Sequence, residues 1–386
     1  MAADAAAKWL EGQLPKMEEA LEALVNVNSF TDNPEGGRKV ARLLETLFAI
    51  PGLSAKIVPS QRYADHLVFR SDPKGAQAAP VALVGHLDTV FPPGKFEGYR
   101  VDGELRRGPG VLDMKGGLVV IAFALKALQE TVGMDALPPL RIVIVSDEEV
   151  GSPEGQGVIR EGIEGAGACL VFESGRQNDL IITRRKGTGA FTAVAHGKAA
   201  HAGNGHQEGK NAIWALARFI DRAQQLTDYE KGVTINVGKI SGGQGKNTVP
   251  DRAEALADLR FCTQADAEGL MDKVRQAAQE AVASLPGTRI EVDGGMARPP
   301  LERSDANVAL MNRYGEAARA HGLGFGEAGL IGGGSDASTS SSMGIPSIDG
   351  LGPRGKGFHT VEEFIEVGTL IPKAQALARC LVELAK

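Results

Sequence analysis

The chain has 386 residues, 43% of them hydrophobic, and a formal net charge of −6. Its length suggests two domains, and its acidic balance without a stripe of Lys and Arg argues against a nucleic-acid partner. No apolar run approaches the roughly 20 residues that a membrane span needs. The first residues have the pattern of an amphipathic helix and not of a signal peptide. We therefore expect a cytoplasmic protein without a membrane partner, or a periplasmic or secreted one if a signal segment has been removed.

The three cysteines lie far apart in apolar stretches, at Cys169, Cys262 and Cys380. This spacing indicates buried thiols and neither a disulfide framework nor a cysteine zinc site. Any bound metal must therefore be held by histidines and carboxylates.

The first predicted element is a helix over residues 3–25, indicated by the helical spacing of its large apolar residues. Short, nearly continuous apolar runs follow, which are typical of strands buried on both faces. These runs span 81–85, 141–146 and 168–172, and a helix is predicted over 116–130. The alternation indicates an α/β sheet covered by helices, in which ligands bind at the carboxyl ends of the strands.

The pattern changes near Lys186, where a second unit begins. Its predicted elements are strand 190–196, helix 210–225, strands 233–240 and 252–262, helix 265–284 and strand 288–293. Apolar residues alternate along strand 252–262, which indicates a half-exposed sheet with helices on its apolar face. The first pattern resumes after residue 299. The predicted fold class is therefore α/β, with a three-layer domain (1–186 and 299–386) interrupted by an inserted α+β domain (187–298).

Polar residues follow the first buried strand in the motif Gly-His-Leu-Asp-Thr, which contains His86 and Asp88. Residues two apart on a strand point the same way, so His86 could bind metal while Asp88 accepts its other ring N–H. Asp113 lies in Gly-Pro-Gly-Val-Leu-Asp-Met-Lys-Gly-Gly, just before a helix. Asp113 is either a helix cap or a metal ligand on a rigid turn. His86 and Asp88, taken alone, also fit a structural role.

Three consecutive acids, Asp147, Glu148 and Glu149, follow the strand 141–146. Such neighbours repel one another, and a bound cation relieves that cost; a solvated acidic loop is the other interpretation. Two adjacent glutamates can divide the work, because one can ligate metal while the other transfers a proton of water.

The combination of strand ends is more informative than any single residue. Glu173 ends the strand 168–172, so glutamates and His86 are predicted at one edge of the sheet. His359 adds a second histidine near the C-terminus, in Gly-Lys-Gly-Phe-His-Thr. Two histidines and several carboxylates suit a pair of zinc ions that share one carboxylate. Such ions, about 3.5–4 Å apart, polarise a carbonyl and generate hydroxide near neutral pH.

A run of glycines precedes a short predicted helix at residues 332–336. It lacks the spacing of a dinucleotide or phosphate loop, so we expect Gly333 and Gly334 to let the backbone approach a substrate. The inserted domain contributes two arginines, Arg260 and Arg298, whose guanidinium groups suit carboxylates. Each arginine could instead be a solvated surface charge.

With these motifs in this order, the sequence resembles the M20 metallopeptidase family, and within it the glutamate carboxypeptidases of the carboxypeptidase G2 type. The resemblance covers nearly the whole chain and departs from the family at Pro109, where a Gly-Arg-Gly turn is more usual. It implies a zinc-peptidase-like catalytic domain with two Zn²⁺ ions per chain. It also implies that the inserted domain is a lid and dimerisation domain, and hence that the protein is a homodimer.

The resemblance implies five metal ligands: His86, Asp113, Glu149, Glu173 and His359. Asp113 would bridge both ions. His86 and Glu149 would fall on separate ions, with Glu173 joining the His86 or the His359 side. The commonest family pattern instead puts His86, Asp113 and Glu149 on one ion, and Asp113, Glu173 and His359 on the other.

The remaining implied roles concern catalysis and substrate binding. Glu148 would be the general base, and Asp88 would support His86. His201 and Asn247, from Gly-Lys-Ala-Ala-His-Ala-Gly and Asn-Thr-Val-Pro, would polarise the scissile carbonyl. In the inserted domain, Arg260 would hold the free carboxylate of the substrate, and Arg298 the side-chain carboxylate of a glutamate.

The implied reaction is hydrolysis of a C-terminal amide bond that releases glutamate, or a similar acidic amino acid, from a short peptide or an N-acyl amino acid. Glu148 would deprotonate the attacking water and pass the proton to the leaving amine, while His201 stabilises the oxyanion. An aminoacylase or desuccinylase-like deacylase is the first alternative, which would not need Arg298. A non-catalytic binding module is disfavoured because neither a ligand nor the base is missing.

Overall fold

The protein is described by a computed structural model over residues 2–73 and 77–385. The chain divides into two compact units. The first comprises Met1–Arg184, Arg303–Ile331 and Ser335–Lys386, and the second comprises Arg185–Glu302 with Gly332–Gly334. The second unit is thus inserted into the sequence of the first and also includes the glycine run.

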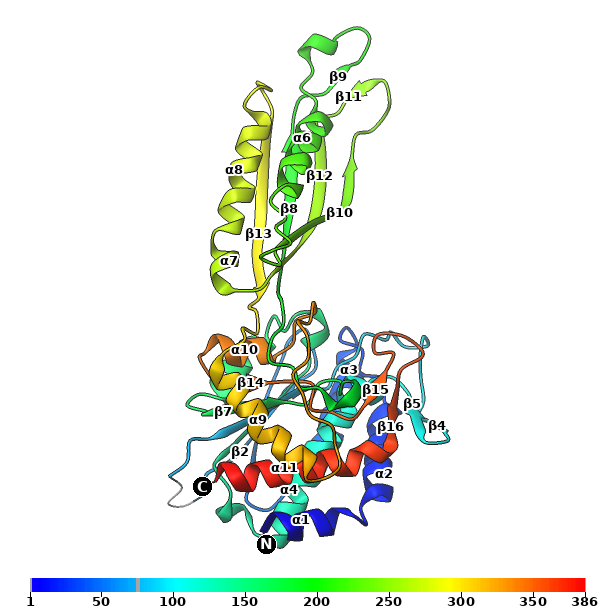
Figure 1. Ribbon diagram of the computed structural model, residues 1–386. Helices are drawn as coiled ribbons and strands as arrows, with labels where there is room; N and C mark the ends of the chain where they lie inside the picture. Colours follow the sequence, from blue (N-terminus) through cyan, green and yellow to red (C-terminus); the bar gives the residue numbers. More distant parts are fainter. Residues whose placement is uncertain (1, 74–76, 386) are drawn as a thin grey trace. The chain divides into compact units, whose positions relative to one another are not determined.

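The first unit is built on a six-stranded mixed sheet with the order β1-β2-β6-β3-β7-β14 (Figure 1). Its strands are β1 (Ser54–Val58), β2 (His66–Ser71), β3 (Val81–His86), β6 (Leu140–Val145), β7 (Ala168–Val171) and β14 (Ser347–Ile348). The strands β6, β3, β7 and β14 are parallel, whereas β2 runs antiparallel to both of its neighbours, β1 and β6. All residues of β3 and β7 are buried, which confirms the expectation from their continuous apolar runs.

Helices cover both faces of this sheet, giving the three layers that the sequence predicts. They are α1 (Ala2–Leu10), α2 (Leu14–Val25), α3 (Pro34–Leu47), α4 (Gly116–Thr131), α5 (Gly155–Gly162), α9 (Asp305–Arg319), α10 (Ala337–Ser342) and α11 (Leu370–Leu384). On one face, α4 and α11 share a core with Leu83 and Ile142. On the other face, Gly162 of α5 packs against Val143, and α10 contacts both α5 and β7.

The helix predicted over residues 3–25 is in fact two helices, because Gly12 lies between α1 and α2 and Pro15 stands in the first turn of α2. Glycine weakens a helix interior, and proline is tolerated at the first helical turn. The first helix packs along α11, where the Gln375 Nε2 donates a hydrogen bond to the Ala7 carbonyl at 2.9 Å. The two ends of the chain therefore lie side by side (Figure 1).

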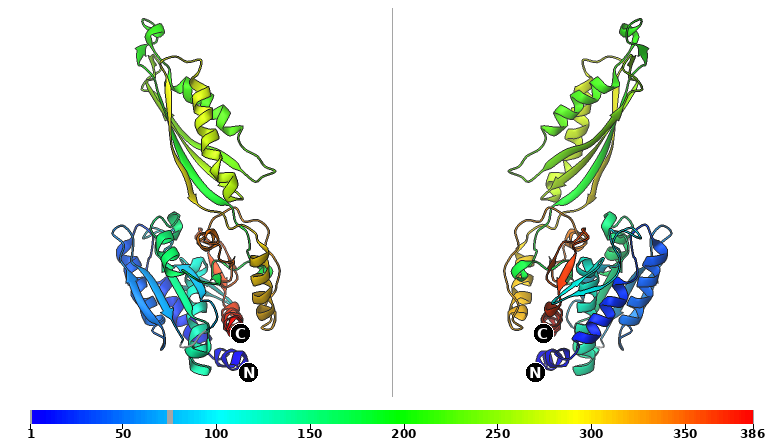
Figure 2. Two further views of the ribbon diagram at one scale, coloured as in Figure 1. Left: turned by 90° about the vertical axis from the view of Figure 1, so that its left-hand side faces the viewer. Right: turned by 90° about the vertical axis from the view of Figure 1, so that its right-hand side faces the viewer.

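The second unit has a four-stranded antiparallel sheet with the order β10-β12-β8-β13. Its elements are β8 (Gly187–His196), β9 (Ala200–His201), α6 (Ala212–Gln224), β10 (Thr234–Gly242), β11 (Thr248–Val249), β12 (Arg252–Phe261), α7 (Gln264–Glu268), α8 (Leu270–Val282) and β13 (Arg289–Arg298). Figure 2 shows α6 and α8 side by side along the sheet, in agreement with their contacts. Alternate residues of β12 are buried beneath them, as the sequence predicts.

The first unit contains a second, small sheet with the strand order β15-β16-β5-β4. Its strands are β4 (Arg100–Asp102), β5 (Leu105–Arg107), β15 (Gly355–Lys356) and β16 (Phe364–Glu366). It brings the segment after residue 350 to the turn that precedes α4. Among the described residues, none of the helices combines the length and the apolar character that a membrane crossing requires.

Candidate metal centre

Three neighbouring parallel strands end beside one another and place one imidazole and three carboxyl groups at one edge of the sheet. His86 is the last residue of β3. Glu148 and Glu149 stand in a short 3₁₀ turn after β6, and Glu173 follows β7. This placement agrees with the expectation from the apolar runs, because carboxyl ends of parallel strands meet at one edge.

Asp113 lies between two imidazoles. It belongs to the turn Val111–Lys115 before α4, and a cis peptide bond joins it to Met114. Its Oδ1 is 3.3 Å from the His86 Nε2, and its Oδ2 is 3.3 Å from the His359 Nε2. Each oxygen of one carboxylate therefore faces a different histidine, which is the arrangement that a bridging ligand of two metal ions requires.

Each of the two histidines also has a glutamate beside it, Glu149 near His359 and Glu173 near His86. The Glu149 Oε2 is 2.9 Å from the His359 Nε2, and the Glu173 Oε1 is 3.7 Å from the His86 Nε2. These contacts favour the division in which His86 and Glu149 serve separate ions, over the pattern that joins them on one ion. The two halves overlap, since ligand atoms of His86, Asp113 and Glu149 also lie within 4.8 Å of one another.

The electrostatics of the cluster favour a bound cation. Burial raises the pKa of Glu149 to about 8 and the pKa of Glu173 well above its ordinary value, and the charge of Asp113 adds to both shifts. Burial alone would raise the pKa of Asp113 as well, but hydrogen bonds from His359 and His86 hold it below its usual range. The same contacts with Asp113 and Glu149 raise the pKa of His359 to about 10. Buried carboxylates that repel one another are stabilised when a cation binds between them.

Asp88 connects the histidine to the glutamate turn. The His86 Nδ1 is 3.0 Å from the Asp88 carbonyl oxygen and 3.3 Å from its Oδ1. The backbone N–H groups of Glu148 and Glu149 donate to the two carboxylate oxygens of Asp88, each at 3.2 Å. The Thr31 hydroxyl, which the sequence did not single out, donates to the Asp88 Oδ2 at 2.7 Å. One buried aspartate thus holds both the imidazole and the candidate general base in place.

Glu363 is a second residue that the sequence did not single out. It is fully buried, and its carboxylate accepts backbone N–H groups of Leu112 and Asp113 at 2.8 and 3.0 Å and of Gly110 at 3.1 Å. It lies four residues after His359, whose φ of 62° is uncommon for a residue other than glycine. One short segment therefore supplies a candidate ligand and fixes the turn that presents Asp113. Its only signal in the sequence is an acid next to Glu362, which an exposed loop would also show.

Replacing Glu363 by Gln is expected to weaken both the fold and metal binding. An amide nitrogen cannot accept, so at least one of the three N–H groups would lose its partner; hydrogen bonds to charged groups contribute about 1.5–3 kcal/mol. We expect a free energy of unfolding lower by about 2 kcal/mol and metal affinity lower by about 10- to 100-fold, as for other groups that orient ligands. Denaturant unfolding and metal titration measure both effects. Glu362→Gln, at a side chain that is 80% exposed, is the control, and equal values for the two variants would refute the role of Glu363.

The predicted carbonyl-polarising residues of the second unit lie close together. His201 pairs with Thr248 across the β9 and β11 ladder, and the Ala202 N–H donates to the Asn247 carbonyl at 2.9 Å. The His201 Nδ1 accepts the Gly203 N–H at 3.2 Å and a further backbone N–H one residue later. In the neutral ring the hydrogen is therefore on Nε2, which leaves an exposed imidazole N–H donor.

The two predicted arginines differ in their surroundings. Arg260 makes a forked pair with Asp258, with Nε and Nη2 at 2.8 and 2.9 Å from its two oxygens, and leaves Nη1 near the Gly332 carbonyl at 3.5 Å. Arg298 is only 3% exposed. A Cβ on Gly334 would lie 2.8 Å from the Arg298 Cδ, so the close approach at this glycine is to the arginine. The interpretation of Arg298 as a solvated surface charge is therefore wrong.

Residues 183–285 match the peptidase dimerisation domain of the M20 family. Carboxypeptidase G2 of Pseudomonas sp. (strain RS-16) is 27% identical over 376 residues, which cover 96% of this chain and 89% of the relative. A succinyl-diaminopimelate desuccinylase of Psychrobacter sp. (strain PRwf-1) is 26% identical over 339 residues, 81% of each chain. The solved M20 family metallo-carboxypeptidase Sso-CP2 of Sulfolobus solfataricus shares the fold, with a TM-score of 0.74 at 16% identity over 96% of this chain and 99% of that one.

The two sequence relatives are named as a carboxypeptidase and a desuccinylase, so they support a hydrolase of this family and do not identify one substrate. The six-stranded sheet and the inserted unit agree with the zinc-peptidase fold expected from the sequence. The chain therefore carries the dimerisation domain of the M20 peptidases and is homologous to carboxypeptidase G2 and other hydrolases of that family.

Proposed function

We propose that the protein is a carboxypeptidase that binds two Zn²⁺ ions and releases glutamate, or a similar acidic amino acid, from short peptides or N-acyl amino acids. The observation that carries the proposal is the Asp113 carboxylate, whose two oxygens face His86 and His359. Glu173 would complete the site on the His86 side and Glu149 on the His359 side. Imidazole and carboxylate donors in these numbers suit zinc.

When bound, the ions would polarise the scissile carbonyl and lower the pKa of an attacking water. The protein's own groups would then direct the proton. Glu148 lies in the same cluster, where its ligand atom and those of His86 and Glu173 are within 4.8 Å of one another. The Asp88 carboxylate accepts the backbone N–H of Glu148. The Glu148 carboxylate would accept the water proton and return it to the leaving amine.

The second unit would recognise the substrate. The exposed His201 Nε2–H would donate to the carbonyl oxygen as negative charge develops on it, with Asn247 beside it. Arg260 uses one edge of its guanidinium for Asp258 and has Nη1 on the other edge for the free carboxylate of the substrate. Gly333 has no other atom within 4 Å of an added Cβ, so its backbone remains open to approach.

The two units would divide these tasks. We propose that the first is the catalytic domain and the second the lid and dimerisation domain, in agreement with the match of residues 183–285 to a dimerisation domain. The strand β10 is an edge of its sheet, and an unpaired edge can bind a second copy of the chain. The active form would be a homodimer in the cytoplasm.

A deacylase is the second candidate, and the burial of Arg298 favours it. Arg298 as a whole residue is 3% exposed, so a glutamate side chain could contact it only in a buried site. An aminoacylase or desuccinylase-like enzyme would not need that contact, and the desuccinylase relative provides a precedent for the class.

Two arginine variants distinguish the candidates. Each charge-assisted contact is worth about 1.5–3 kcal/mol, so the carboxypeptidase should prefer glutamate over alanine as leaving residue by about tenfold to a few hundredfold. Arg298→Ala should shrink this ratio and leave N-acyl alanine almost unaffected, whereas Arg260→Ala should weaken both substrates alike. The measurement is kcat/KM for both substrates.

Arg252→Ala is the matched control, since Arg252 is an exposed arginine of the same strand β12 that pairs with Glu254. If wild type shows no preference for the acidic residue, or if Arg298→Ala lowers both rates equally, the deacylase replaces the carboxypeptidase.

A further inference from the structure

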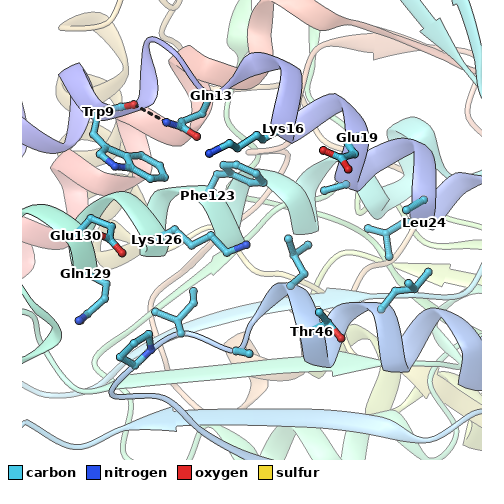
Figure 3. Close-up of a pocket in the computed structure, with 17 residues that line it drawn as sticks. Trp9, Gln13, Lys16, Glu19, Leu24, Thr46, Phe123, Lys126, Gln129 and Glu130 are labelled. Carbon is cyan, nitrogen blue, oxygen red and sulfur yellow. Dashed lines mark hydrogen bonds between the residues drawn. The ribbon is translucent and has the colours of Figure 1, made fainter.

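A pocket of about 520 Å³ lies in the first unit between α1, α2, α3 and α4 (Figure 3). This volume falls in the range of small-molecule sites. None of the residues that line the pocket belongs to the candidate metal centre, and the proposed reaction makes no use of it. The pocket could therefore bind a molecule independently of that reaction.

The wall of the pocket is largely apolar and comes from all four helices. Trp9 lines it from α1, Leu24 from α2, Leu47 from α3 and Phe123 from α4, and Ile50 follows α3. The aromatic and branched side chains can bury the apolar part of a ligand, and this burial of apolar surface is the main source of affinity in such sites.

Two lysines, Lys16 of α2 and Lys126 of α4, also line the pocket. Figure 3 shows their ammonium groups directed into it and away from the carboxylates of Glu19 and Glu130. The Lys126 Nζ is 5.1 Å from the centroid of the Phe123 ring. Burial lowers the pKa of Lys126, and the charge of Lys16 lowers it further. In the part of the chain that the structure describes, no ion pair involves either lysine.

Two like charges beside an apolar wall repel each other, and an anion between them reduces that repulsion. We propose that this pocket binds a small amphipathic carboxylate, with its carboxylate between Lys16 and Lys126 and its apolar body against Leu24, Leu47 and Phe123. A neutral molecule of the same shape would leave the two ammonium groups without a partner, and a cation would add a third like charge.

Decanoate is a suitable probe, and the chain contains its own reporter. It has two tryptophans, Trp9 on the pocket and the exposed Trp214 of the second unit. In a Trp214→Phe background, Trp9 fluorescence reports the pocket alone. Titration below the micelle concentration of decanoate should give a saturable change, with one molecule bound per chain by calorimetry. Decanol and decylammonium should bind at least about tenfold more weakly, as expected when a charge-assisted contact is lost.

Variants in the same background test the two lysines and the cavity. Lys16→Gln and Lys126→Gln should each lower decanoate affinity by about tenfold, whereas Lys8→Gln, at an exposed lysine that does not line the pocket, should leave it unchanged. Ala23→Phe should block the pocket and abolish binding without removing a charge. The proposal is overturned if decanoate gives no saturable signal. It is also overturned if decanol binds as tightly as decanoate, or if the lysine variants bind like wild type.

Discussion

Glu148→Gln is expected to retain its metal and to lose about 10²- to 10⁴-fold in kcat, the usual contribution of a group that transfers a proton. Glutamine keeps the shape of the side chain and the backbone N–H that donates to Asp88. It removes the acceptor that would take the proton of the attacking water. The ligands proposed for the two ions, Glu149 and Glu173 among them, remain in place.

The measurement combines kcat on an N-acyl glutamate with the metal content of the same sample. Glu154→Gln, a few residues along the chain and not in the candidate centre, is the matched control and should show nearly the wild-type rate. A Glu148→Gln variant with full metal content and a normal rate would show that another group is the base.

Asp113→Ala is expected to lose both metal ions together, and with them all measurable hydrolysis. Its carboxylate contacts the imidazoles on both sides of the centre, at 3.3 Å from each. Without it, each half retains one imidazole and one glutamate, fewer than the three protein ligands of a typical catalytic zinc site. The two losses should therefore occur as one event in a metal titration.

Asp113→Asn refines this test because it preserves volume and leaves one oxygen acceptor. It should bind at most one ion with near-native affinity. Asp135→Ala, at an exposed aspartate of the same unit, controls for nonspecific effects of losing a carboxylate. One ion bound at native affinity to Asp113→Ala would contradict bridging by this residue.

The sheet edge was predictable because continuous apolar runs determine buried parallel strands, and the residue after each run then lies at the carboxyl end. This reasoning places His86, Glu149 and Glu173 at that edge. It does not place Asp113 or His359, since no local pattern states that the turn before α4 meets a segment near the C-terminus. The resemblance to a family supplied that link.

Other features depend on contacts that periodicity cannot reveal. The acid at Glu363 looks like any loop glutamate, and only the fold shows that three N–H groups surround it. Arg298 is apparent as a charge in the sequence, yet only the fold shows that it is buried and lies beside Gly334. The break at Gly12 could, by contrast, have been predicted, because glycine often interrupts a helix. The regular spacing of the leucines instead favoured one continuous helix, and the structure has two.

The most direct test of the proposed centre is a titration of metal-free protein with Zn²⁺. Calorimetry measures the number of ions bound, and the rate of hydrolysis of an N-acyl glutamate is measured at the same metal concentrations. Two ions should bind per chain, and hydrolysis should appear only as both sites fill. Saturation by a single ion, or a rate that is the same with and without metal, would contradict the proposed centre.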